Sequence, residues 1–188
     1  MAKVVVNTTS PMSGRRLVRD VNRLIASGYQ TTVDDDMASF DVRFEGPMGT
    51  AYEGGVWTVN VAMPQEYPLK PPRLRFLTKI WHPNIESTTG LVCMNVFKEA
   101  WSTTYDLMNI FDTFLPQLLR NPNPLDPLNH EAAAILKRSE QEFKENVTMY
   151  KRMYAQPLVI VSKCSEELEK RSSDLSLSDL VSDDDDDD

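Results

Sequence analysis

The hydrophobic positions of this 188-residue chain change their spacing twice, and each spacing is typical of one kind of element. In the first segment they follow the i, i+4, i+7, i+8 stripe of an amphipathic helix: Leu17, Val21, Leu24 and Ile25. A Ser or Pro within residues 10–13 is suited to begin this helix, and Gly28 is suited to end it. We therefore expect one helix before the first strand.

From Tyr29 onward, apolar and polar residues alternate, as they do in strands that bury one face. Three segments show this alternation, and a short first strand precedes them: Thr31–Val33, Phe40–Phe44, Trp57–Val61 and Leu74–Phe76. Turn-forming Asp, Gly and Pro residues separate the segments. The pattern predicts an antiparallel meander of four strands.

Residues 78–104 then show little periodicity. A compact domain seldom contains so long an irregular segment without a functional reason. Because this segment contains His82, Cys93 and Trp101, we expect the functional site to lie in it.

The helical spacing returns in a wide apolar stripe: Leu107, Ile110, Phe111, Phe114, Leu115 and Leu118. Pro116 lies inside this stripe, so it must kink the helix or occupy a position that lacks a backbone hydrogen bond. Asn129 and Ser139 are suited to cap two further helices, which end near residues 137 and 154. Strands and helices are thus segregated along the chain, which indicates an α+β fold.

The charge of the chain is concentrated at one end. Residues 166–188 contain eleven acidic and two basic side chains, a net charge of −9, which leaves +1 for residues 1–165. We therefore expect three parts: a flexible arm at residues 1–11, a folded domain at residues 12–156, and a disordered, acidic, Ser- and Asp-rich tail at residues 157–188. A near-neutral domain has no electrostatic footprint for nucleic acid.

Localisation follows from two further counts. No apolar run is long enough for a bilayer span or a signal peptide, so we expect no membrane association and a place in the cytoplasm or nucleus. Two cysteines, Cys93 and Cys164, are too few for a disulfide scaffold, and each is expected to be a free thiol.

The irregular segment contains a motif with fixed spacing. Trp81-His82-Pro83-Asn84-Ile85 is followed, after four residues, by Gly90-Leu91-Val92-Cys93-Met94, which resembles the active-site signature of ubiquitin-conjugating enzymes. Supporting segments occur in the family's order: Tyr52–Gly55, Tyr67–Pro72, Trp101 and Pro122–Leu128. The resemblance covers residues 12–154, and the Asn121–Pro124 segment together with the acidic tail looks most like the ubiquitin-conjugating enzyme H branch.

The resemblance implies a fold and a reaction. The fold is an N-terminal helix, a four-stranded antiparallel sheet, an active-site loop and C-terminal helices. Cys93 would accept ubiquitin from an activating enzyme as a thioester, and a substrate lysine would then attack that thioester, usually with the help of a ubiquitin ligase. Exchange of one thioester for another has little net free-energy cost, and the final amide is more stable than the thioester. No metal or bound cofactor is needed, because the separate activating enzyme uses the ATP.

The same resemblance assigns roles to single residues. Asn84 would stabilise the oxyanion of the tetrahedral intermediate, a contribution of about 2.7–4 kcal/mol in other enzymes. Asp126 would orient the lysine amine and help to deprotonate it. His82 would shape the loop rather than act as a base. The remaining residues of the expected active-site loop are Pro83, Asn95 and Trp101.

Partner-binding residues are also implied by the resemblance. One set lies on the first helix, where the family meets the activating enzyme and the ligase: Arg15, Arg16 and Arg19. A second set lies in two loops that contact the ligase: Pro68, Leu69, Thr103 and Thr104. We expect the protein to act as a monomer.

Three alternatives stay open. The first alternative is a conjugating enzyme for another ubiquitin-like modifier. Many relatives have Asp where this chain has Asn95, and an Asn there also occurs in the branch that carries the ubiquitin-like protein Nedd8. An inert variant that only binds ubiquitin or a ligase is the second alternative, although inert relatives typically lack the thiol of Cys93. The third is a generic thiol redox protein, which is weak because no second cysteine lies near Cys93 in the sequence.

The tail has two interpretations. It is either a solubilising extension or an electrostatic docking segment for a basic surface of a ligase or substrate. Ser176 and Ser182 each precede an acid by three residues, which makes them candidate phosphorylation sites.

Overall fold

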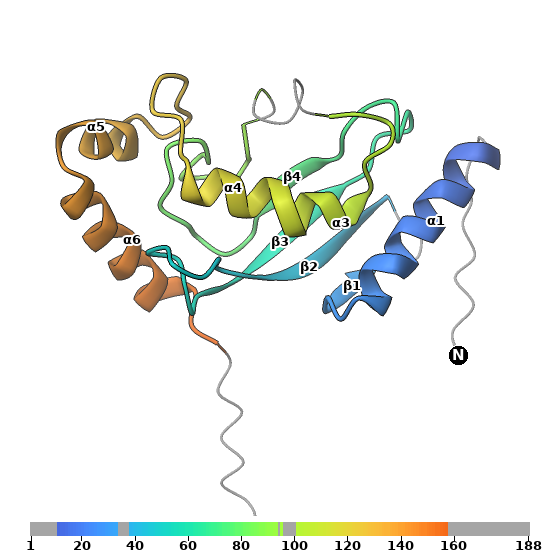
Figure 1. The fold of residues 1–188 in the computed structure, drawn as a ribbon, viewed down its shortest axis with the longest axis horizontal. Coiled ribbons are helices and arrows are strands. Elements are labelled where there is room, and N and C mark those ends of the chain that lie inside the picture. Colours follow the sequence, from blue (N-terminus) through green and yellow to red (C-terminus); the bar gives the residue numbers. More distant parts are fainter. Residues whose placement is uncertain (1–10, 34–37, 94, 96–100, 158–188) are drawn as a thin grey trace, which may run out of the picture. The chain divides into compact units, whose positions relative to one another are not determined.

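The computed structural model of the protein describes residues 11–33, 38–93, 95 and 101–157 (Figure 1). Most of the predicted arm and nearly all of the predicted tail, with Ser176 and Ser182, lie outside the described residues, so those assignments stay predictions. No helix in the described ranges is long and apolar enough to cross a membrane.

The sheet has four strands that pair in sequence order. They are β1 (Thr31–Val33), β2 (Ser39–Glu45), β3 (Val56–Ala62) and β4 (Arg73–Phe76), and all three pairs are antiparallel. The predicted alternation sets the register: the buried residues of β2 lie opposite those of β3, as Val42 does opposite Val59. The predicted meander is therefore confirmed.

The helices surround this sheet at its ends and on one face. Helix α1 (Pro11–Ala26) precedes the sheet, and α5 (His130–Arg138) and α6 (Glu140–Tyr154) follow it. Figure 1 shows α1 and the α5–α6 pair on opposite sides, with α3 (Leu107–Asn109) and α4 (Leu115–Arg120) crossing the sheet between them. Phe111 of this crossing segment packs against Phe44 of β2, with 6.3 Å between ring centroids. The α+β class is thus confirmed, and one hydrophobic core joins the sheet to its helices.

The crossing segment is not one continuous α-helix. It consists of α3 (Leu107–Asn109), a π-helical segment η1 (Ile110–Phe114) and α4 (Leu115–Arg120). The Leu115 N–H donates to the carbonyl five residues back, that of Ile110. Pro116 therefore lies in the first turn of α4, where its missing N–H is tolerated. The wide turn accommodates the proline that the hydrophobic stripe could not explain.

Both predicted caps are present. The Asn129 side chain accepts a hydrogen bond from the Ala132 N–H at 3.0 Å, and the Ser139 hydroxyl accepts one from the Glu142 N–H at 3.2 Å. These bonds satisfy N–H groups that the first turn of a helix leaves without partners, so they fix where α5 and α6 begin.

Candidate active site

Cys93 lies in a short segment that runs back along the edge strand of the sheet. The Phe76 N–H donates to the Gly90 carbonyl at 2.8 Å, and the Val92 N–H donates to the Leu74 carbonyl at 3.0 Å. The Cys93 N–H then donates to the Asn84 carbonyl at 2.9 Å. Backbone pairing thus places Cys93 beside the His82–Asn84 segment, although eight residues separate Asn84 from Cys93 in the chain. The cysteine is 7% exposed.

Gly90 makes this return possible. Its φ is +73°, in the left-handed region that residues with a side chain rarely adopt. A Cβ atom at this position would lie 1.9 Å from the carbonyl oxygen of Phe76. Only glycine therefore allows the segment to approach β4 closely enough to form the hydrogen bonds described above.

His82 is fully buried, and both of its ring nitrogens have partners. Nδ1 accepts the Asn84 backbone N–H at 3.0 Å, so it carries no proton. Nε2 lies 3.0 Å from the Leu118 carbonyl oxygen, so it carries the proton and donates it. Burial lowers the pKa of His82 to about 4 and keeps the ring neutral. The ring thus joins the active-site segment to α4 and has no free lone pair with which to act as a base.

Asn84 is also fully buried, and its side chain holds the Pro-rich loop. Its Oδ1 accepts the Asn123 N–H at 2.8 Å. Its Nδ2 donates to the carbonyl oxygens of Asn123 at 2.7 Å and of Asp126 at 3.1 Å. Both amide hydrogens are therefore in use, and stabilisation of an oxyanion by this amide would require one of these bonds to open. Next to it, the Pro83 carbonyl accepts the N–H groups of Leu128 and Asn129.

Asn95 and Asp126 lie close together on the surface. The Asn95 Nδ2 donates to the Asp126 Oδ2 at 3.1 Å. Both side chains are exposed, in contrast to the buried Asn84. Cys93, Asn84, Asn95 and Asp126, which the sequence placed in two separate segments, therefore belong to one connected site.

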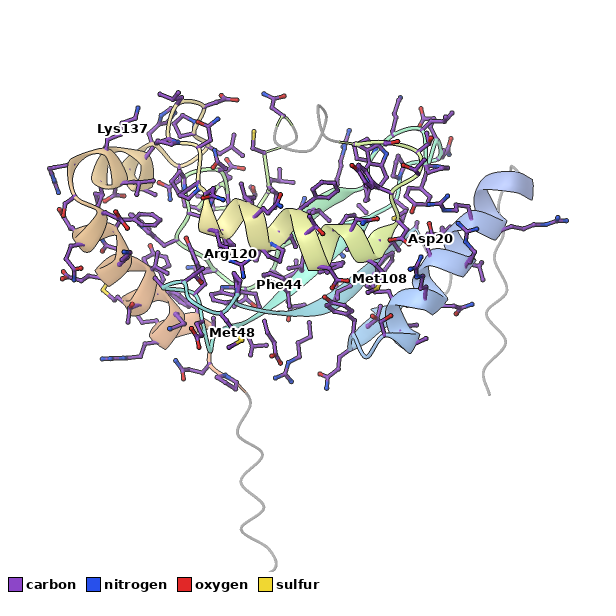
Figure 2. The ribbon with its side chains drawn as sticks, viewed as in Figure 1. Asp20, Phe44, Met48, Met108, Arg120 and Lys137 are labelled. Atoms are coloured by element: carbon purple, nitrogen blue, oxygen red, sulfur yellow. The ribbon has the colours of Figure 1, made fainter. Side chains whose placement is uncertain are left out.

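Asp20, which is only 1% exposed, joins α1 to the first loop of the expected partner surface, and its neighbour Arg16 joins α1 to the second. Its carboxylate accepts hydrogen bonds from the Arg16 Nε at 2.5 Å, the Tyr67 hydroxyl at 2.6 Å and the Arg19 Nε at 3.2 Å. Burial, and then the bond to Asp20, raise the pKa of Tyr67. Arg16 also donates to the Tyr105 carbonyl at 2.8 Å. Figure 2 shows Asp20 on the side of α1 that faces the rest of the domain.

The predicted partner residues therefore divide into two groups. Arg16 faces inward, whereas the Arg19 side chain is 65% exposed. The other outward members of the set are Arg15, Leu69, Thr103 and Thr104. Between the two loops, the Trp101 Nε1 donates to the Pro68 carbonyl at 2.9 Å.

Sequence reasoning missed Asp20, although a signal was present. Asp20 lies three residues after Leu17 and four after Arg16, and so it is an acid on the buried stripe of an amphipathic helix with a base one turn away. Sequence reasoning also missed the role of Asn123, because its backbone bonds to the side chain of Asn84, which lies in a distant segment of the chain. In the described part of the chain, no group of three or more His, Cys, Asp or Glu side chains could hold a metal ion.

Comparison with known proteins gives a consistent result. A family model described as ubiquitin-conjugating enzyme matches residues 16–151. The chain is 42% identical over 181 residues to ubiquitin-conjugating enzyme E2 5 of Arabidopsis thaliana, covering 96% of this chain and 94% of that protein. It is 43% identical over 150 residues to ubiquitin-conjugating enzyme E2-23 kDa of Triticum aestivum, covering 79% and 80% of the two chains.

A solved structure agrees with these relatives. The E2 domain of a Toxoplasma gondii ubiquitin conjugating enzyme superposes with a TM-score of 0.69 at 30% identity, covering 76% of this chain and 99% of that chain. The narrower assignment to the H branch stays a prediction. The chain therefore belongs to the ubiquitin-conjugating enzymes, a family of transferases whose general partners are ubiquitin, an activating enzyme and a ligase.

Proposed function

We propose that this enzyme carries ubiquitin as a thioester on Cys93 and transfers it to a substrate lysine, usually with a ligase. The observation that carries the proposal is that hydrogen bonds join the segments of Cys93, Asn84 and Asp126. Backbone pairing holds Cys93 beside Asn84, and the Asn84 side chain holds the loop that contains Asp126. A nucleophile, a source of hydrogen-bond donors and a carboxylate thus lie on fixed backbone segments.

Each group has a part in the proposed reaction. The Cys93 sulfur accepts the acyl group of the ubiquitin C-terminal glycine from the activating enzyme. The lysine amine, whose ordinary pKa is about 10.4, then attacks the thioester carbonyl after losing a proton, and Asp126 orients this amine. Asn84 acts first by holding the loop. Its oxyanion role follows only when one of its amide hydrogens is released to the intermediate.

The surroundings of the site fit this proposal. The reaction needs a free thiol, and a free thiol persists in a reducing compartment, which favours the cytoplasm or nucleus.

The exposed residues of the partner surface would contact the activating enzyme and the ligase: Arg15, Arg19, Leu69, Thr103 and Thr104. Arg16 faces inward and stabilises this surface through its bonds to Asp20 and the Tyr105 carbonyl.

The proposal is tested by incubating the full chain with activating enzyme, ATP and ubiquitin, and by running gels with and without a thiol reductant. We expect a ubiquitin adduct that the reductant removes and that Cys93→Ala does not form, while Cys164→Ala still forms it. An adduct with Nedd8 but not with ubiquitin would overturn the choice of modifier. No adduct with either protein would favour an inert binding variant.

A further inference from the structure

In the contact between Asn95 and Asp126, Asn95 is the hydrogen-bond donor and Asp126 is the acceptor. An uncharged amide donates a hydrogen bond to one carboxylate oxygen, Oδ2, over 3.1 Å. The main chain of Asp126 is fixed separately, because its carbonyl accepts from the buried Asn84 amide. Two asparagines from the two halves of the active-site segment therefore hold one acidic residue, the first by its backbone and the second by its side chain.

We propose that Asn95 is a positioning residue for Asp126 in the transfer step, an inference that rests on the function proposed above. The second carboxylate oxygen, Oδ1, has no hydrogen bond to any residue in the described ranges, and in this proposal it accepts a hydrogen bond from the lysine amine. The bond from Asn95 limits rotation of the side chain and directs that free oxygen. Hydrogen bonds to an ionised acceptor are stronger than neutral ones, which suits a pair exposed to water.

The transfer step conserves atoms and charge. The lysine nitrogen forms a bond to the thioester carbon, the bond from that carbon to the Cys93 sulfur breaks, and the electron pair leaves on sulfur as a thiolate. The surplus proton of the nitrogen passes by way of the free oxygen of Asp126 to solvent. In this proposal Asn95 takes no part in bond making, and its effect acts through its hydrogen bond to Asp126.

The residue type at position 95 separates this proposal from a simple charge effect. Asp has nearly the same shape as Asn but donates no hydrogen bond when ionised, and it would place a like charge beside Asp126. If position 95 acted only through charge, Asn95→Asp would attract the cationic lysine and speed transfer. If it acts by donating a hydrogen bond, the same change slows transfer. The two accounts therefore predict opposite signs.

The test measures single-turnover discharge of the Cys93–ubiquitin thioester to free lysine in the absence of a ligase. We expect Asn95→Asp and Asn95→Ala to lower the discharge rate at saturating lysine about three- to tenfold, with little change in the lysine concentration for half-maximal rate. In an Asp126→Ala background the same changes should have no further effect. Gln141→Glu is the matched control, because Gln141 donates to Glu145 at 2.9 Å on exposed α6.

Four outcomes would overturn the proposal. Discharge by Asn95→Asp that equals or exceeds that of the unchanged protein would overturn the proposal, as would an effect of Asn95→Ala that persists without Asp126. A loss in Gln141→Glu as large as that in Asn95→Asp would assign the effect to net charge and also overturn it. If the unchanged protein formed no thioester at all, the proposed function would fail, and this inference with it.

Discussion

The buried side chain of Asn84 offers the sharpest test of how this site is built. In Asn84→Ala, three hydrogen bonds are removed at once: one from the Asn123 N–H, one to the Asn123 carbonyl and one to the Asp126 carbonyl. The loop then loses its hydrogen bonds to Asn84, while the bond from Asn95 to Asp126 and those from Leu128 and Asn129 to Pro83 remain. We therefore expect a folded protein with a loosened loop.

The size of the effect follows from the count of bonds. A hydrogen bond contributes about 1 kcal/mol net to stability, so Asn84→Ala should lower the free energy of unfolding by roughly 3 kcal/mol. For a domain of this size, each 1 kcal/mol shifts Tm by about 2–4 °C, so Tm should fall by roughly 6–12 °C. A matched control is Asn60→Ala, which removes the single bond that Asn60 donates to Asp41 at 2.7 Å. Its expected loss is about 1 kcal/mol.

Urea unfolding of both variants measures these losses. The midpoint should shift with the slope unchanged, because the folded state stays compact. A loss in Asn84→Ala below about 0.5 kcal/mol would refute the reasoning. In that case the Asn84 amide would not hold the loop, and any slower lysine transfer by this variant would have to come from loss of an oxyanion donor.

Two further predictions concern the same segment. Because burial lowers the pKa of His82 to about 4 from an ordinary 6.5, the unfolded chain takes up a proton first as the pH falls. The free energy of unfolding should therefore fall by up to roughly 3 kcal/mol between pH 6.5 and 4. Urea unfolding at several pH values measures this fall, which should be steeper in the unchanged protein than in His82→Asn. A parallel pH dependence in the two proteins would contradict it. Gly90→Ala should lower stability by more than Gly49→Ala, since both glycines have positive φ but only Gly90 lies against the Phe76 carbonyl. Thermal melts that place the two variants within 1 °C of each other would argue against a close approach.

The sheet and most helices follow from the local pattern of the chain. Buried positions alternate strictly in β2 and β3, and a shift of register by one residue would turn Phe40, Val42 and Phe44 of β2 to the other face of the sheet. The cap residues Asn129 and Ser139 mark their helices because their side chains satisfy backbone N–H groups nearby in sequence. The π-helical segment before Pro116 was not predictable in this way. The proline signals a missing hydrogen bond, but several backbone solutions tolerate it, and packing of the neighbouring core residues selects one.

The site shows the same division between local and distant information. The motif around Cys93 carries the resemblance to ubiquitin-conjugating enzymes, and that resemblance predicts Cys93 as the nucleophile. The contacts that organise it, from Asn84 to Asn123 and from Asn95 to Asp126, join residues more than 30 positions apart. No local pattern encodes such pairs, because each depends on where the Pro-rich loop returns. The inward direction of Arg16 was missed for a related reason, since its helix position does not show which carbonyl groups another loop will bring to it.

The position of Asp20 has a consequence for exchanging segments between relatives. The helix with Arg16 and the loop with Tyr67 share this one buried carboxylate, and Arg16 reaches a third segment at Tyr105. A chimera that received only the helix, or only one loop, would bring a donor without its acceptor or an acceptor without its donors. We expect the three segments to be transferable only together, so a change of ligase preference by grafting requires a block that runs from α1 through both loops.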